Sequence, residues 1–142
     1  MDRKGSAVWQ GDLKGGKGTM SVESGLLKDA PYSFQTRFED AKGTNPEELI
    51  GAAHAGCFSM AFSNNLATAG HVPDKVETTA TVTMKPVDGA PTVTAIHLAV
   101  SAKVPGIGQA EFDEIAKKSK ETCPISRLLK AAEITMDAKL VS

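Results

Sequence analysis

Residues 44–70 read TNPEELIGAAHAGCFSMAFSNNLATAG, and this stretch decides the fold. Asn45 or Thr44 suits the cap of a helix, Pro46 suits its first position, and the two acidic residues that follow are favoured there by the helix dipole. Gly70 provides a stop. We therefore predict one long helix that begins at Pro46 and ends just before Gly70.

The predicted helix is apolar around most of its circumference. Small Ala, Gly and Ser side chains fill much of residues 52–63, so another backbone can approach closely. A helix that is apolar on nearly all sides must be buried on nearly all sides. A chain of 142 residues offers little to surround it. We therefore expect an intimate homodimer.

Short alternating segments separated by glycines occupy the first third of the chain. They predict antiparallel strands over residues 6–9, 19–24 and 32–38. The glycines at 15, 16 and 18 could be taken for a phosphate-binding loop, but no GKS or GKT ending follows them. A hairpin turn is the better interpretation.

The rest of the chain shows a second pattern of strands and helices. Asp88-Gly89 lies between two segments of period two, which predicts a hairpin with one buried face. Helical spacing follows over residues 109–121, a short helix opens at Pro124, and residues 134–140 alternate as a final strand. Strands on both sides of central helices predict an α+β protein with a single domain over residues 1–142.

Composition excludes several classes of function. Lys and Arg number 16 against 17 for Asp and Glu, a net charge of −1, so no basic field favours nucleic acid or an anionic membrane. The apolar runs stop short of the roughly 20 residues that cross a bilayer. The first residues contain no apolar stretch typical of a signal peptide. We expect a soluble protein of the reducing cytoplasm.

Cys57 and Cys123 are the only cysteines. In a reducing compartment such a pair is more often catalytic, redox-sensing or metal-binding than a permanent disulfide. Cys123 stands before Pro124 at the mouth of a helix, where the dipole favours a thiolate. Cys57 lies inside a helix and needs a charged neighbour from elsewhere. Local electrostatics therefore favours Cys123 as the more acidic thiol.

Histidines allow two further interpretations. His54 lies one helical turn before Cys57 and could act as its base, although a histidine among small apolar residues is more often a core group. A metal site would draw on His54, Cys57, His71, His97 and Cys123. Their spacing matches no zinc pattern, and CxxC is absent.

Three stretches together resemble one known family. RFEDAKGTNPEELIGAAHAGCFSMAF (37–62), VPGI (104–107) and CPISRLLK (123–130) closely resemble the OsmC branch of the OsmC/Ohr family, and the similarity extends over essentially the whole chain. The resemblance implies an OsmC-like fold, with two antiparallel sheets around long central helices in an intertwined homodimer. It also implies a thiol-dependent peroxidase in oxidative and osmotic stress defence, with organic hydroperoxides preferred over hydrogen peroxide.

The resemblance assigns roles to individual residues. It makes Cys57 the attacking cysteine and Cys123 the one that resolves it as a disulfide, which reverses the preference from local electrostatics. Glu47 matches the family's glutamate, and Arg37 is our choice for its arginine, which would favour the Cys57 thiolate. The implied reductant is an external dithiol, of the lipoyl type or another small thiol, and no cofactor is implied.

Helix geometry adds a constraint to this assignment. Glu47 and Cys57 are ten residues apart, which is about 15 Å along a straight helix and roughly 80° out of phase. We therefore expect a composite site at the dimer interface, with Glu47 contributed by the opposite subunit. Apolar side chains near these residues in the sequence could guide an alkyl hydroperoxide: Phe34, Phe38, Phe58 and Met60.

Two other functions stay open. One is a stress-induced dimeric protein that binds an apolar small ligand and whose cysteines are oxidisable without being catalytic. The other is a thiol–disulfide oxidoreductase acting on proteins, which the lack of CxxC disfavours.

Overall fold

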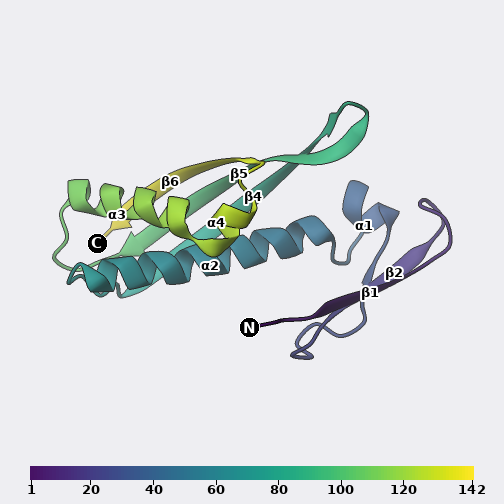
Figure 1. The fold of residues 1–142 in the computed structure, drawn as a ribbon, viewed down its shortest axis with the longest axis horizontal. Coiled ribbons are helices and arrows are strands. Elements are labelled where there is room, and N and C mark those ends of the chain that lie inside the picture. Colours follow the sequence, from purple (N-terminus) through teal and green to yellow (C-terminus); the bar gives the residue numbers. More distant parts are fainter. The chain divides into compact units, whose positions relative to one another are not determined.

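Runs of strands and pairs of helices follow one another along the chain, which confirms the predicted α+β class (Figure 1). The computed structural model describes all of residues 1–142. The chain divides into two units, Met1–Leu49 and Ile50–Ser142. Helix α2 begins in the first unit and continues into the second.

The first unit is a small antiparallel sheet with one short helix. Strands β1 (Gly5–Gln10), β2 (Lys17–Val22) and β3 (Ala30–Tyr32) pair in the order β1-β2-β3. The hairpin predicted around the glycines at 15, 16 and 18 is confirmed, because Gln10 pairs with Lys17 across it.

The strand predicted over residues 32–38 is wrong beyond Tyr32, because residues 34–38 form helix α1 (Phe34–Phe38). Its start is a capping box: Ser33 N–H donates to Thr36 Oγ1 at 2.9 Å, and Thr36 N–H donates to Ser33 Oγ at 3.3 Å. These reciprocal bonds satisfy N–H groups that a helix start leaves free. The short apolar pattern alone did not separate a strand from a helical turn.

Helix α2 (Pro46–Thr68) confirms the long helix predicted from its end signals. Asn45 is the cap, since its Oδ1 accepts a hydrogen bond of 2.8 Å from Glu48 N–H. Gly70 follows the last turn at φ 93°, a left-handed conformation that glycine adopts without strain.

The second unit contains a mixed sheet. Strands β4 (Lys75–Val87) and β5 (Ala90–Lys103) form the predicted antiparallel hairpin, with Asp88 and Gly89 both at positive φ in its turn. Strand β6 (Glu133–Val141) pairs with β5 in parallel. The expectation of two antiparallel sheets is therefore wrong for this pair. Two helices return the chain to the end where β5 began, as parallel pairing requires.

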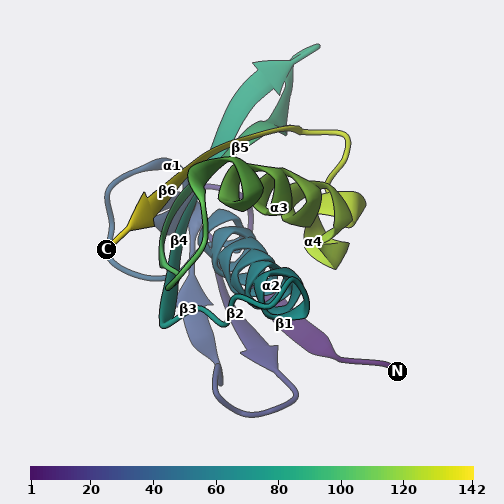
Figure 2. The same ribbon diagram turned by 90° about the vertical axis from the view of Figure 1, so that its left-hand side faces the viewer.

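Helices α3 (Gln109–Thr122) and α4 (Pro124–Leu128) make that return. Figures 1 and 2 show α2 and α3 together on one face of the β4-β5-β6 sheet. The core between them combines both helices with the inward residues of β5: Phe58, Phe62, Leu66, Ile96, Leu98, Val100, Ala102, Phe112 and Ala116. Every buried hydrophobic side chain of the structure belongs to this second unit.

One face of α2 stays open in the single chain. Ala52, Ala53, Gly56 and Met60 are exposed there, with Met60 at 77%. A single chain thus leaves part of α2 uncovered, and the homodimer expected to cover it stays a prediction. No helix in the structure has the length and apolarity needed to span a membrane.

Candidate active site

The two cysteines lie side by side in the second unit. Cys57 is on the fourth turn of α2, and Cys123 is the joint between α3 and α4. Their Sγ atoms are 3.0 Å apart and not bonded covalently. Cys123 is fully buried, whereas Cys57 is partly exposed. The sulfurs are therefore within about 1 Å of disulfide bonding distance.

The backbone fixes Cys123 from both directions. Its N–H donates to Ser119 O at 2.9 Å, which ends α3, and its carbonyl accepts from Arg127 N–H at 3.0 Å, which starts α4. Pro124 disfavours the helical conformation for the residue before it, and Cys123 accordingly adopts φ −53° and ψ 128°. This kink between two helices turns the sulfur towards α2.

The surroundings of Cys57 in its own unit favour the neutral thiol. Burial raises the pKa of the Cys57 thiol, and a hydrogen bond from the Ile125 backbone acts in the opposite direction without cancelling the effect. A nucleophilic thiolate at this position therefore requires an additional positive charge.

Arg37 and Glu47 form an ion pair in the first unit. Arg37 Nη2 and Nε donate to Glu47 Oε1 at 2.7 and 2.9 Å, and Nε also approaches Oε2 at 3.2 Å. The side chains are 36% and 14% exposed. Arg37 lies in the last turn of α1 and Glu47 in the first turn of α2, and Asn45 joins the two helices by donating to Thr36 O at 3.1 Å. The structure thus brings together the two charged residues that the resemblance singled out.

Aromatic side chains surround Arg37. Its guanidinium lies 5.2 Å from the centroid of the Phe38 ring, and the Phe38 and Phe34 centroids are 5.0 Å apart. A pocket of about 260 Å³ opens beside them, lined by Trp9, Leu13, Tyr32, Ser33, Phe34, Arg37 and Phe38. Of the four apolar residues expected near the site, Phe34 and Phe38 line this pocket, whereas Phe58 belongs to the core of the second unit.

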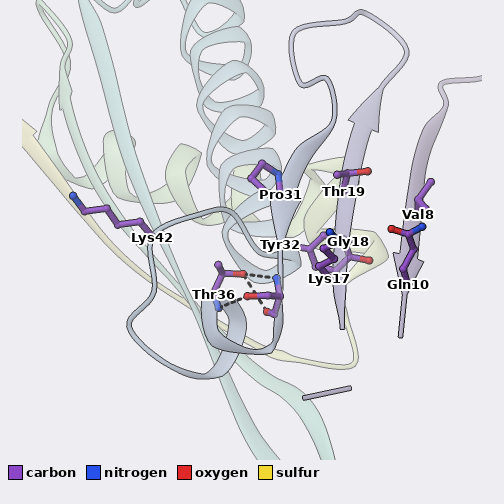
Figure 3. Close-up of a pocket in the computed structure, with 10 residues that line it drawn as sticks. Val8, Gln10, Lys17, Gly18, Thr19, Pro31, Tyr32, Thr36 and Lys42 are labelled. Carbon is purple, nitrogen blue, oxygen red and sulfur yellow. Dashed lines mark hydrogen bonds between the residues drawn. The ribbon is translucent and has the colours of Figure 1, made fainter. Parts of the chain in front are cut away.

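A second pocket of the first unit lies across the sheet. It measures about 420 Å³, and Figure 3 shows its lining residues on β1, β2 and β3 and around α1, with Lys17 and Lys42 among them. It contains neither the thiols nor the Arg37–Glu47 pair. We therefore assign the candidate chemistry to the thiols and the ion pair, and not to this pocket.

His54 bonds to a residue that the sequence did not single out. Its Nε2 lies 2.7 Å from Ser126 Oγ, both side chains are buried, and burial lowers the pKa of the imidazole. Ser126 follows Cys123 by three residues, just as His54 precedes Cys57 by three. That matching spacing, on two helices bearing the cysteines, is the one signal in the sequence that could have indicated the contact.

The ligand set weighed for a metal site is not assembled. The structure contains no cluster of three or more His, Cys, Asp or Glu side chains that could hold a metal ion. His71 pairs instead with Glu111, and His97 with Asp137 and Thr135.

Comparison with known proteins defines the family. The OsmC family model, described as OsmC-like protein, matches residues 39–139. Peroxiredoxin OsmC of Escherichia coli (strain K12) is 55% identical over 140 residues, which are 99% of this chain and 97% of that protein. This chain belongs to the OsmC family. More distant relatives support the same family assignment.

One of them is an organic hydroperoxide resistance protein of Xanthomonas axonopodis pv. citri (strain 306), which is 30% identical with 79% of each chain covered. The crystal structure of an OsmC-like protein from Mycoplasma pneumoniae superposes with a TM-score of 0.74 over 100% of this chain and 99% of that one. At 19% identity that likeness concerns the fold. The OsmC-like fold expected from the sequence is confirmed.

Proposed function

We propose that this OsmC family protein is a thiol-dependent peroxidase that reduces organic hydroperoxides, and hydrogen peroxide less efficiently, in defence against oxidative and osmotic stress. The observation that carries the proposal is the pair of free thiols with their sulfurs 3.0 Å apart. The names of its relatives, peroxiredoxin and organic hydroperoxide resistance protein, support the same reaction.

The reaction needs two steps at Cys57. Its thiolate attacks a peroxide oxygen, the O–O bond breaks, and the leaving alkoxide takes up a proton to become an alcohol, which leaves Cys57 as a sulfenic acid. The Cys123 sulfur then attacks the Cys57 sulfur. A disulfide forms, and the S–O bond breaks to release water. Overall the peroxide is reduced by two electrons that the two thiols supply.

An external dithiol then restores the enzyme by thiol–disulfide exchange. A lipoyl-type dithiol or another small thiol fits this role, because exchange at a partly exposed Cys57 needs a slender reductant. We place the protein in the cytoplasm, where thiols are kept reduced between turnovers.

The Arg37–Glu47 pair supplies the charge that Cys57 lacks. A guanidinium beside the sulfur favours the thiolate, and the carboxylate of Glu47 holds the guanidinium in one orientation. The aromatic side chains around Arg37 form an apolar approach for the alkyl part of the peroxide. An ordinary surface ion pair would contribute little, so the function of this pair rests on its closeness to a thiol.

The active site is completed by a second copy of the chain. Glu47 and Cys57 belong to one continuous helix, so ten residues of α2 separate them by about 15 Å along its axis. Pairing of two subunits through the open face of α2 would bring Arg37 and Glu47 of one chain to Cys57 of the other. The two units of residues 1–142 then act as one functional domain within an intertwined homodimer.

Treatment of the reduced protein with one equivalent of cumene hydroperoxide tests the proposal. We expect both thiols to be lost to an intramolecular Cys57–Cys123 disulfide, seen by peptide mass spectrometry, and catalytic peroxide consumption once a dithiol is added. Cys57→Ser should abolish turnover.

Cys123→Ser is the matched control, since it should still react once with the peroxide and stop at the sulfenic acid. Persisting turnover in Cys57→Ser would refute the assignment. Stoichiometric oxidation without turnover would favour the alternative of a dimeric protein that binds an apolar ligand.

A further inference from the structure

Two contacts tie α4 and its capping residue to α2. One is the sulfur pair Cys57–Cys123, and the other is the hydrogen bond of 2.7 Å between His54 Nε2 and Ser126 Oγ. The Ile125 backbone also hydrogen-bonds the Cys57 thiol, so the His54–Ser126 bond is the one side-chain hydrogen bond between these elements that involves no sulfur, and Ser126 is the one buried residue of α4. Both contacts use residues three apart on each helix, so they lie about one turn from each other.

The His54–Ser126 bond is fully removed from water. Both side chains are buried, and His54 Nδ1 has no hydrogen-bond partner. A buried polar group costs free energy unless it is paired, so an imidazole retained here with one unpaired nitrogen calls for a reason. Its remaining bond is the one side-chain hydrogen bond between α2 and α4 that does not involve the Cys57 sulfur. Loss of that bond would leave α4 and its capping residue held to α2 only by apolar packing and by contacts of the Cys57 sulfur with Cys123 and the Ile125 backbone.

The sulfur contact is interrupted during the proposed reaction. When Cys57 becomes a sulfenic acid it carries an added oxygen, which must be accommodated beside a Cys123 sulfur only 3.0 Å away. The direct contact between the two sulfurs then no longer holds the kink at Cys123 in place. The His54–Ser126 bond involves neither sulfur and persists through this step.

The inference rests on the proposed peroxidase function. We propose that His54 and Ser126 are positioning residues, which hold Cys123 against Cys57 while Cys57 is a sulfenic acid. They thereby set how often the sulfenic acid forms the disulfide instead of reacting with a second peroxide. In that competing reaction the sulfenic sulfur attacks a peroxide oxygen, the O–O bond breaks, an alcohol leaves, and a sulfinic acid remains.

Ser126→Ala removes the hydroxyl and tests the role. The reduced protein is treated with cumene hydroperoxide in the presence of dimedone, which traps sulfenic acids, and labelled Cys57 is counted by mass spectrometry. We expect the ratio of trapped sulfenic acid to disulfide to rise about five-fold, the change that follows when a hydrogen bond worth about 1 kcal/mol is lost. Sulfinic Cys57 should appear at correspondingly lower peroxide concentrations.

Ser119→Ala is the matched control. Ser119 is also fully buried, and its hydroxyl joins α2 to α3, accepting from Asn65 Nδ2 at 2.8 Å and donating to Ile115 O at 2.8 Å. Its removal costs two buried hydrogen bonds, at least as large a loss as in Ser126→Ala, but leaves the α4 anchor intact. We expect the Ser119→Ala ratio to match that of the unmodified protein.

Two variants of the histidine separate positioning from mere stability. His54→Gln keeps a polar group near the Nε2 position and should preserve the ratio, whereas His54→Leu should raise it as Ser126→Ala does. An equal shift in Ser119→Ala and Ser126→Ala, or no shift in Ser126→Ala and His54→Leu, would overturn the proposal. If Cys57 of the unmodified protein is not oxidised at all, the proposed function itself has failed, which is a different result.

Discussion

The thiol of Cys57 lies 3.0 Å from the Cys123 thiol, while burial raises its pKa above the ordinary value. The first property suits disulfide formation, and the second opposes attack on a peroxide, because only the thiolate is nucleophilic. The two are compatible if the activating charge arrives from a different part of the assembly. The reactivity of Cys57 then depends on correct assembly, and an isolated subunit would hold it in the less reactive thiol form.

His54 makes the stability of the protein depend on pH. Burial lowers the pKa of its imidazole below the ordinary 6.5, so the unfolded chain takes up the proton before the folded one does as pH falls. The contribution of neutral His54 is complete above pH 6.5 and is lost as pH falls towards the lower folded-state pKa. We expect the free energy of unfolding to fall below pH 6.5, by at most about 1.4 kcal/mol per pH unit from this one proton.

Urea unfolding of the unmodified protein and of His54→Gln between pH 7.5 and pH 5 checks this expectation. Every other titrating group is common to both proteins, so the difference between the two curves isolates His54. The difference in the free energy of unfolding between the two proteins should narrow as the pH falls. Parallel curves over the whole range would contradict a lowered pKa at His54.

At the scale of elements, the sequence predicts best where local signals are complete. Helix α2 carries a cap at Asn45, a proline at its first position and a glycine after its end, and the structure begins and ends it there. The strand prediction for residues 34–38 was wrong because the decisive signal there is a pair of reciprocal hydrogen bonds between Ser33 and Thr36 rather than a pattern of apolar residues. A reciprocal capping pair of this kind produces no periodic apolar signal, so hydrophobic patterning does not indicate it.

Pairing partners are a harder problem, because they depend on tertiary structure. The alternation of β6 predicts a strand, but it does not state that the strand lies parallel to β5. Ser126 likewise looks like an ordinary polar residue of a short helix until the fold brings it to His54. Cys57 and Cys123 stood out in the sequence by themselves, but the attacking role expected of Cys57 and the choice of Arg37 and Glu47 came from the family resemblance, since local electrostatics alone favoured Cys123.

The end of α2 gives a prediction for a single glycine. Gly70 has φ 93° and its N–H donates to Ala67 O at 3.0 Å, with no atom within 4 Å of where a Cβ would be. Substitution therefore meets backbone strain without a clash. Gly70→Ala should destabilise the protein by about 1 kcal/mol. Gly70→Asn also adds a Cβ but tolerates this conformation, and should cost clearly less.

Thermal and urea unfolding of the two variants measure this difference. Equal destabilisation by Ala and Asn would show that the left-handed conformation is not what Gly70 is needed for.

At the scale of the whole molecule, the distribution of buried side chains points to assembly. The first unit contributes no buried hydrophobic side chain, although it carries Trp9, Tyr32, Phe34 and Phe38. The open face of α2 exposes small apolar residues and Met60. Apolar surface left on two parts of one chain is the condition under which a partner subunit gains most from association. Association would also supply Cys57 with the charge that its own unit lacks.

A purified heterodimer tests whether the site is shared between subunits. One subunit carries Cys57→Ser, the other carries Arg37→Ala, and different affinity tags isolate the mixed pair. If Arg37 acts across the interface, one of the two sites combines an intact Cys57 with an intact Arg37. The heterodimer should then show about half the peroxidase rate of the unmodified dimer, whereas each homodimeric variant should be nearly inactive.

The matched control pairs an unmodified subunit with one carrying both substitutions. If the sites are shared between subunits, neither site of that dimer is complete, since one lacks the thiol and the other lacks the arginine. The control dimer should therefore be nearly inactive. If each subunit were self-sufficient, the two results would be exchanged: the split heterodimer would be inactive, and the control would retain about half the rate. Peroxide consumption with a saturating dithiol distinguishes these patterns directly, because each arrangement makes one heterodimer active and the other inactive.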